Sequence, residues 1–422
     1  MKSLKILYKV SKRIFFAITN LLVLLVSLMI PKTNRIIVVG GWFGKRFADN
    51  SKYFFLYANE NKKKLGLYKV IWITRSNKIK EELKRKGYCV YKIWSIQSIW
   101  YHLRSRIHLI DQSSSDINPF FSVRSKRINM WHGFPLKKIG TFMKDCNKNK
   151  IRKNNCILVF LDKISTRGFW SDRYILATSK FSASVLGQAF GVPSEKVIVS
   201  GYPRNYELIV NKPIKYISEN EIECLNIIRS EKERSKSIIG YFPTFRDKRE
   251  TLIFGIKDNN ELHEVLDYFE RLNIKIIGKF HFADKNDEFK GIYYHKTFVN
   301  LPSDADIYTF INEIDILITD YSSIYFDFLL WNRPIIFFPY DLEYYQNEDR
   351  GIIFDYDTIT PGPKVYNVSE LKALFLDGVE SFTVAYHSKY QDKALQLKKK
   401  VFENITEMDI EHLIKQIKFI NT

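Results

Sequence analysis

The chain has 422 residues, of which 45% are hydrophobic and 15% aromatic, and it carries a formal net charge of +20. This length and composition support a large core and about two domains, and they exclude a disordered or fibrous protein. The positive charge favours anionic partners such as nucleic acid, a membrane surface or phosphorylated substrates. The four cysteines (Cys89, Cys146, Cys156 and Cys224) show neither metal-ligand spacing nor a disulfide pattern, which is typical of a reducing compartment.

Basic residues up to Arg13 precede an apolar run from Ile14 to Ile30, which ends at Pro31. Three interpretations fit this order: a cleaved signal peptide, a membrane-spanning helix, or a helix on the cytoplasmic membrane face. The run lacks a small-residue cleavage site, and it is short for the about 20 residues that cross a bilayer. We favour the third interpretation, in which residues 1–31 form a membrane-associating helix on anionic lipid and the chain is peripheral or anchored at the cell membrane.

After this segment, short apolar runs that predict buried strands alternate with segments that predict helices. The predicted strands are Arg35–Gly40, Lys69–Thr74, Arg106–Asp111, Arg127–Trp131, Tyr174–Thr178 and Val197–Ser200, and helices are predicted around Tyr53–Tyr57, Ile79–Lys86 and Phe181–Phe190. Such alternation predicts a mostly parallel sheet with helices on both faces. We therefore expect an N-terminal lobe over residues 32–210.

A polar segment, residues 211–236, is expected to link this lobe to a second one and to hold a helix near Glu219–Arg229. The alternation then restarts, with strands Ile238–Phe242, Lys275–Gly278, Ile316–Thr319 and Ile335–Phe338 and helices Asn260–Leu272, Ile307–Glu313 and Ile324–Leu330. We expect a C-terminal lobe over residues 237–395 and a C-terminal helix within residues 396–422. Two doubly wound lobes facing a cleft bind ligands at the carboxyl ends of their strands.

The segment Ile316–Phe328, ILITDYSSIYFDF, contains the clearest candidate site. Its strand ends at Asp320, and a helix opens at Ser322 and Ser323. Unpaired amides and the dipole at a helix N-terminus favour an anion, so this turn predicts a phosphate site. Because Ser and Asp are also preferred helix caps, the same residues fit a purely structural role.

Four more segments follow predicted strands and combine Gly, Pro, His or Arg with hydroxyl residues: Trp131–Lys138, Ser200–Asn205, Phe242–Asp247 and Gly278–His281. His132, beside Gly133, can take the proton of a hydroxyl nucleophile, although local backbone groups could equally hold it. Lys279 and His281 suit phosphate binding or protonation of a phosphate leaving group, and a buried structural role is the alternative for His281.

Two arginines, Arg204 and Arg246, lie close to prolines in predicted turns. A guanidinium group in such a turn can bind phosphate oxygens in a bidentate manner, or it can form an internal salt bridge. The sequence contains no recognised nucleic-acid-binding module, so we expect no nucleic acid partner. A metal is not expected either, because no pair of carboxylates lies beside the predicted diphosphate site.

These segments form an ordered series: WHGFPLKKIG, SGYPRN, PTFRD, K-x-H, ITDYSSIYFDF and RPIIFFPYDLEYYQNEDRGIIFDY, followed by PGP. From Asn34 to Val379 the series resembles the CDP-glycerol glycerophosphotransferase family, which comprises teichoic acid primases and polymerases and related capsule enzymes. The resemblance implies an α/β GT-B fold with the acceptor in the N-terminal lobe and the donor in the C-terminal lobe. It implies transfer of glycerol phosphate from CDP-glycerol to a lipid-linked or polymer acceptor, with release of CMP and without a cofactor.

By motif, the resemblance implies that His132 is the base on the acceptor hydroxyl and that His281 lies at the donor phosphates. The other residues that it assigns to substrate binding are Gly133, Arg204, Thr244, Arg246, Lys279, Thr319, Asp320, Ser322, Ser323, Asp327 and Asp341. Phe282 stands where the family usually has Pro after K-x-H, and Tyr206 stands where it usually has Asp. The first departure weakens the role of His281. The second weakens any role assigned to the loop that contains Arg204 and Asn205.

Three other functions remain compatible with the sequence. The first is ribitol phosphate transfer from CDP-ribitol, because a few pocket side chains decide between these donors. The second is a GT-B glycosyltransferase that uses a nucleotide sugar. The third is a basic membrane-bound scaffold that binds anionic polymer without turnover.

Overall fold

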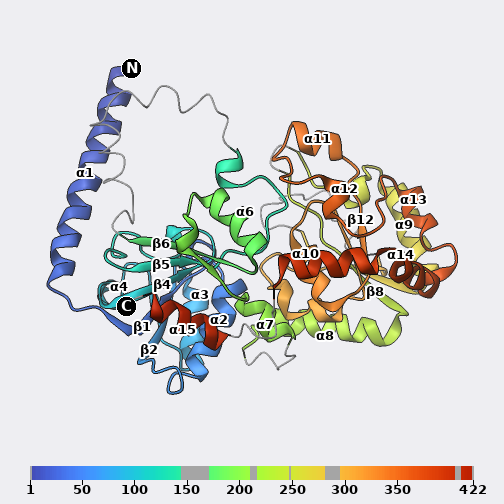
Figure 1. The fold of residues 1–422 in the computed structure, drawn as a ribbon. Helices are drawn as coiled ribbons and strands as arrows, with labels where there is room; N and C mark the ends of the chain where they lie inside the picture. Colours follow the sequence, from blue (N-terminus) through green and yellow to red (C-terminus); the bar gives the residue numbers. More distant parts are fainter. Residues whose placement is uncertain are drawn as a thin grey trace. The chain divides into compact units, whose positions relative to one another are not determined.

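A computed structural model describes residues 2–143, 171–209, 216–246, 249–280, 295–403 and 410–420. The chain divides into two compact units, each with its own sheet (Figure 1). Unit 1 comprises Met1–His132, Lys144–Glu207 and Asn404–Thr422, and unit 2 comprises Gly133–Met143 and Leu208–Glu403. Every strand pair is parallel within the described residues, which confirms the predicted α/β class.

Unit 1 contains a seven-stranded sheet in the order β3-β2-β1-β4-β5-β6-β7. The strands are β1 (Thr33–Val39), β2 (Lys69–Thr74), β3 (Val90–Lys92), β4 (Ser105–Ile110), β5 (Lys126–Asn129), β6 (Asp172–Ala177) and β7 (Val197–Val199). The predicted strands all form, and β3 is an addition. Central strands such as β1 are runs of Ile and Val because helices cover both faces and bury successive side chains alike.

The helices of unit 1 are α1 (Lys2–Leu28), α2 (Asp49–Glu60), α3 (Asn77–Arg85), α4 (Ile96–Arg104), α6 (Lys180–Phe190), α7 (Pro203–Ile209, whose last two residues belong to unit 2) and α15 (Ile410–Phe419). Serines cap three of them: the hydroxyls of Ser76, Ser95 and Ser179 accept N–H bonds from the first turns of α3, α4 and α6. Gly191, in the left-handed conformation with φ 61°, ends α6.

Helix α1 is the longest of the described helices (Figure 1). It exposes several large apolar side chains. Ile18, Leu22 and Leu25 are each more than half exposed, whereas Asn20 and Ser27 are buried. One side of the helix therefore packs on unit 1 while another presents apolar groups to solvent. In the part of the chain that the structure describes, no helix combines the length and the apolar character needed to cross a membrane.

Unit 2 contains a five-stranded sheet in the order β10-β9-β8-β11-β12. Its strands are β8 (Ser237–Tyr241), β9 (Ile274–Gly278), β10 (Phe298–Asn300), β11 (Ile316–Thr319) and β12 (Ile335–Phe337). Its helices are α8 (Glu219–Arg234), α9 (Asn259–Arg271), α10 (Ile324–Phe328), α11 (Leu342–Asn347), α12 (Tyr356–Ile359), α13 (Val368–Ala373) and α14 (Gly378–Val401). Helix α9 shows how they pack: Leu262, Val265, Leu266 and Phe269 recur at helical spacing, and all are buried in the core.

Some elements differ from the prediction. The helix expected over Ile307–Glu313 is a pair of 3₁₀ turns, Ile307–Thr309 and Ile311–Glu313. Helix α8, in the segment expected to be a linker, extends to Arg234 and belongs to unit 2. There its Arg229 donates a hydrogen bond to Glu313. In the C-terminal segment, α14 ends at Val401 in unit 2, whereas α15 lies in unit 1, where Glu411 accepts a hydrogen bond of 2.7 Å from Tyr57.

Both sheets have a point at which the strand order reverses. In unit 1 it lies between β1 and β4, and in unit 2 between β8 and β11. Loops leave two such neighbouring strands in opposite directions, which opens a crevice at their carboxyl ends where ligands bind.

Candidate active site

In unit 1, the turn after β5 holds His132 at the carboxyl edge of the sheet. The turn is unusual, because Trp131 has φ 54° and Gly133 has φ 138°. Residues without a glycine's freedom seldom adopt positive φ, so surrounding contacts must hold Trp131 there. The His132 ring is half-buried and packs between aromatic rings, 3.9 Å from that of Trp131 and 5.7 Å from that of Trp42 between centroids.

Two amide side chains hold this turn. The Asn129 Oδ1 atom accepts the N–H of Trp131 at 2.9 Å, and the Asn50 Nδ2 group donates to the carbonyl oxygen of Trp131 at 2.7 Å. Asn50 is fully buried, and its Oδ1 atom accepts the backbone N–H of Arg204 at 3.3 Å. Asn50 thus ties α2 to both the His132 turn and the start of α7.

Arg204 is fully buried, and its guanidinium forms an ion pair with Asp49 beside Asn50. Of the two roles open for this arginine, the geometry corresponds to the internal salt bridge. A buried charge without its partner is very costly, so the pair joins the start of α2 to the start of α7. The sequence did not single out Asp49 or Asn50, although Asp-Asn-Ser before an apolar helix is a recognisable N-terminal signal.

Two further carboxylates lie at the switch point of unit 1. Asp111, directly after β4, accepts the N–H of Ser51 at 3.0 Å, and Gly41 approaches it so closely that a Cβ atom would lie 2.6 Å from Asp111 Oδ2. Burial, followed by repulsion from Asp49 and Asp116, raises the pKa of Asp111 well above its usual range. Burial also raises the pKa of Asp116 to about 6, although four backbone N–H groups oppose this shift.

In unit 2, Asp320 organises the switch point. Its Oδ1 atom accepts the N–H of Thr244, from the loop after β8, at 2.8 Å, and the N–H of Tyr321 at 2.6 Å. Its Oδ2 atom lies 2.6 Å from the Arg246 guanidinium. One carboxylate therefore joins the ends of β8 and β11, the two strands between which the order reverses.

Arg246 is also buried, and it uses both sides of its guanidinium. Asp341, after β12, accepts its Nε–H at 3.2 Å and its Nη2–H at 2.9 Å. Burial alone lowers the pKa of Arg246, but Asp320 and Asp341 outweigh burial and raise this pKa above its usual value. The arginine thus lies in an internal network of ion pairs, which was the alternative to direct phosphate binding.

Ser322 and Ser323 lie between Asp320 of this network and the start of α10. Ser323 caps the helix without a side-chain hydrogen bond, and both serines are half-buried. Among the described residues, neither their hydroxyls nor their backbone N–H groups have a hydrogen-bond partner. The predicted helix Ile324–Leu330 continues as a 3₁₀ turn, Leu329–Trp331, so its dipole is small and the open donors are its main attraction for an anion.

The remaining candidates of unit 2 have varied partners. Thr319 Oγ1 donates to the carbonyl oxygen of Phe242 at 2.7 Å, Asp327 accepts a hydrogen bond from Tyr308 at 2.9 Å, and Lys279 donates to the carbonyl oxygen of Ser303 at 2.9 Å. Within the described residues, the buried Thr244 Oγ1 atom has no partner. His281 and Phe282 lie outside the described residues.

The W-H-G-F-P motif is divided between the units. His132 belongs to unit 1, whereas the chain from Gly133 to Met143 belongs to unit 2. There Phe134 packs on Phe326 of α10 with ring centroids 4.7 Å apart. The segment also pairs with the loop after α11, because Lys138 N–H donates to the carbonyl oxygen of Gly351 at 3.0 Å.

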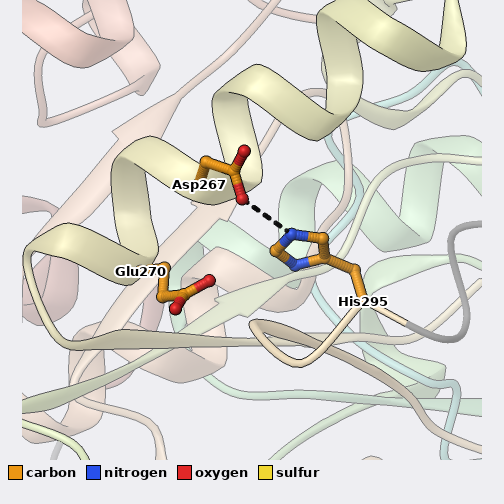
Figure 2. Close-up of side chains that lie close together, drawn as sticks. All are labelled: Asp267, Glu270 and His295. Atoms are coloured by element: carbon orange, nitrogen blue, oxygen red, sulfur yellow. Dashed lines mark hydrogen bonds and ion pairs between the residues drawn. The ribbon is translucent and has the colours of Figure 1, made fainter.

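A cluster with ligand-type side chains lies at the other edge of unit 2. Asp267 and Glu270 on α9 and His295 before β10 have donor atoms within 4.8 Å of one another (Figure 2). His295 Nδ1 accepts the N–H of Thr297 at 3.2 Å, so Nε2 carries the hydrogen toward Asp267, at 3.2 Å. Glu270 pairs with Lys296. This arrangement is a histidine–carboxylate pair near the amino ends of the strands, and its hydrogen-bonding pattern does not favour a metal ligand at Nε2.

Comparisons with known proteins agree with this architecture. The chain is 29% identical to the teichoic acid poly(glycerol phosphate) polymerase of Bacillus spizizenii over 79% of this chain and 81% of that protein. It is 30% identical to the teichoic acid glycerol-phosphate transferase of Staphylococcus aureus, over 81% and 83% of the two chains. The structure of the wall teichoic acid polymerase TagF matches with a TM-score of 0.67 at 22% identity, over 100% of this chain and 97% of that one, which confirms the GT-B fold.

The family pattern of the CDP-glycerol:poly(glycerophosphate) glycerophosphotransferases matches residues 22–406. This match spans both sheets and every candidate residue, so the chain belongs to that family.

Proposed function

We propose that this chain transfers glycerol phosphate from CDP-glycerol to a hydroxyl group of a lipid-linked or polymer acceptor and releases CMP. The observation that supports the proposal most directly is the content of the two switch points. In unit 1, the switch point lies beside the imidazole of His132, which a constrained turn carries. In unit 2, the switch point lies beside the open N–H and hydroxyl donors of Ser322 and Ser323. A base and an anion site are what phosphoryl transfer requires.

Unit 2 is proposed to hold the donor. The diphosphate of CDP-glycerol would accept hydrogen bonds from Ser322 and Ser323 and from the Thr244 hydroxyl. Lys279 supplies positive charge at the end of β9, and His281 is proposed to act at the same phosphates. Arg246 and Asp320 support this site from below, because their ion pair fixes the loops that carry Thr244 and the serines.

Unit 1 is proposed to activate the acceptor. His132 would take the proton of the acceptor hydroxyl as its oxygen attacks the phosphorus that bears glycerol. The bond between that phosphorus and the bridging oxygen breaks, and CMP leaves with the bond's electron pair. Such a transfer depends mostly on positioning and on stabilisation of charge, and general-base catalysis contributes about 10²–10⁴-fold.

The chain is further proposed to work at a membrane surface. The N-terminal lysines and the exposed apolar side chains of α1 form the combination that binds anionic lipid interfaces. A lipid-linked acceptor would then lie in the membrane to which the enzyme binds.

The first test measures CMP release from CDP-glycerol and from CDP-ribitol with a lipid acceptor. We expect CMP from CDP-glycerol and a loss of about 10²–10⁴-fold in turnover for His132→Ala, with donor affinity retained. His263→Ala, at an exposed histidine on α9, is the matched control. Near-normal turnover in His132→Ala would remove the base assignment, and CMP from CDP-ribitol alone would change the donor.

In the same assay, the double variant Ser322→Ala/Ser323→Ala should weaken CDP-glycerol binding. Each lost hydroxyl–phosphate bond costs about 1.5–3 kcal/mol, or about tenfold or more in affinity. Ser184→Ala on the surface of α6 serves as the control. Unchanged affinity for CDP-glycerol in the double variant would move the diphosphate away from α10.

A further inference from the structure

A cavity in unit 1 contains two arginines that the function proposed above does not use. It has a volume of about 210 Å³ and lies beside β4, β5 and β6, near the end of α6. Arg127 and Arg173 line it together with the polar side chains of Ser113, Ser114 and Asn129. The described residues of its lining include no carboxylate.

Arg127 is buried, and no carboxylate among the described residues pairs with it. Its side chain is 7% exposed, and in the described part of the chain its Nη1 atom has no hydrogen-bond partner. Burial, followed by repulsion from Arg173, lowers the pKa of Arg127 to about 10. A buried charge that is neither paired nor fully hydrogen-bonded destabilises the fold unless a ligand compensates it.

The second arginine, Arg173, is exposed at the same cavity. Neither guanidinium forms an ion pair with any carboxylate that the structure describes. Two guanidinium groups with serine hydroxyls and an amide form a donor-rich site, and guanidinium matches phosphate oxygens in a bidentate manner. The cavity is several times larger than the about 30 Å³ share of one water molecule, so it has room for such a group.

The cavity also adjoins the turn of the proposed base. Asn129, which lines the cavity, accepts the N–H of Trp131, the residue before His132. Phe190, another lining residue, packs on the Trp131 ring with centroids 4.6 Å apart. One layer of residues therefore separates the cavity from the His132 turn.

We propose that Arg127 and Arg173 form a subsite for a phosphate group of the acceptor. The inference rests on the proposed function, in which the acceptor is a phosphate-containing lipid or polymer whose terminal hydroxyl reacts. Binding of its phosphate in unit 1 would place a neighbouring hydroxyl by the turn that carries His132. The subsite would select acceptors that already contain a phosphodiester over neutral alcohols.

The first experiment measures binding of glycerol 3-phosphate and inorganic phosphate to the full chain by calorimetry. Arg173→Gln removes an exposed charge and should not affect folding, whereas Arg127→Gln removes the buried one and Arg127→Lys retains it. We expect both Gln variants to bind these probes about tenfold more weakly, as for the loss of one charge-assisted contact. Arg85→Gln, on the exposed end of α3, gives the same change in net charge and should bind like the wild type. Equal affinity in Arg173→Gln, Arg127→Gln and Arg85→Gln would overturn the proposal.

The second experiment separates the two sources of phosphate. In the transfer assay the Gln variants should raise the KM for the acceptor about tenfold and leave the KM for CDP-glycerol unchanged. Binding to phosphatidylglycerol vesicles should stay as in Arg85→Gln. Loss of vesicle binding with an unchanged acceptor KM would overturn the acceptor assignment in favour of a lipid headgroup. If the wild type released no CMP from CDP-glycerol, the proposed function would fail, and the probe-binding data would still decide whether the anion subsite exists.

Discussion

Asn50 shows how much one amide side chain contributes to this enzyme. It is fully buried, donates to the carbonyl oxygen of Trp131 and accepts the N–H of Arg204. Trp131 has positive φ, so this bond helps to hold a backbone conformation that the residue would otherwise leave. The backbone conformation of Trp131 in turn determines where the imidazole of His132 lies.

Asn50→Asp should impair catalysis, and because it buries a further carboxylate beside Asp49 it should lower thermal stability as well. The carboxylate keeps the size of the side chain but cannot donate to the Trp131 carbonyl oxygen, which then faces a like partial charge. We expect kcat to fall about 10–100-fold, as for other residues that orient a catalytic group, with the KM for CDP-glycerol unchanged. Steady-state CMP release checks the rate, and thermal unfolding checks the fold.

Asn61→Asp is the matched control. Asn61 also donates from its amide to a backbone carbonyl, that of Tyr57 at 2.9 Å, but at the opposite end of α2. It should leave kcat unchanged. Equal losses of kcat in the two variants would indicate a general effect on α2 rather than on the His132 turn.

The two arginines singled out from the sequence, Arg204 and Arg246, have the same structural role. Each is buried and forms an ion pair with a carboxylate on another element of the fold. Arg204 pairs with Asp49 at the start of α2. Arg246 pairs with Asp320 and Asp341, in the loops after β11 and β12. The sequence indicated that these turns matter, but it could not tell a phosphate partner from an aspartate. Both partners satisfy a guanidinium in the same way, and only the folded chain shows which one is adjacent.

At the scale of elements, α1 has two different sides. Its buried side packs on unit 1, where Phe16 and Phe120 have ring centroids 5.7 Å apart and Arg124 donates to the carbonyl oxygen of Ser27. Its other side exposes Ile18, Leu22 and Leu25. A single exposed leucine is ordinary, but several in one stripe of a helix indicate an apolar partner.

Deletion of residues 1–31 should release the protein from anionic vesicles into the soluble fraction in a sedimentation assay. A milder variant, Ile18→Ser/Leu22→Ser/Leu25→Ser, should act in the same direction, because each exposed apolar side chain contributes about 1–2 kcal/mol on entering the interface. Leu376→Ser, at an exposed leucine before α14, is the control. Persistent vesicle binding after the deletion would place the membrane-binding surface elsewhere on the chain.

At the scale of the whole molecule, the excess of positive charge affects stability as well as partners. Burial, followed by repulsion from Arg124 and Arg106, lowers the pKa of Lys32 from its ordinary 10.5 to about 7. Burial also lowers the pKa values of four other lysines in the described chain: Lys126, Lys364, Lys398 and Lys418. Between the folded and the ordinary pKa, the unfolded chain holds protons that the folded chain has released.

The free energy of unfolding should therefore rise with pH between 7 and 9, because over this range Lys32 is protonated in the unfolded chain and largely deprotonated in the folded one. One such group contributes up to about 1.4 kcal/mol for each pH unit. Thermal unfolding across this range should show a rising midpoint, and Lys32→Met should flatten the slope. Lys84→Met, on the exposed face of α3, should keep it. A slope that Lys32→Met leaves unchanged would assign the effect to other groups.

The sequence by itself determined the alternation of strands and helices, the parallel sheets and the segments that carry the chemistry. These follow from local patterns: continuous Ile and Val runs predict buried strands, and polar or glycine-containing turns after them predict strand ends. The family resemblance rests on the same local motifs. Short elements such as β3 and the 3₁₀ turns of Ile307–Glu313 were missed or misassigned, because a few residues contain too little periodicity to separate the alternatives.

Only the tertiary structure decided which residues meet. It paired Arg204 with Asp49 and Arg246 with Asp320 and Asp341, and it assigned α15 to unit 1. It also left Arg127 buried with no carboxylate partner in the part of the chain that the structure describes. Contacts between residues far apart in the chain depend on strand order and on the crossing of helices, which local patterns do not specify. The partners of the buried charges follow from the fold alone.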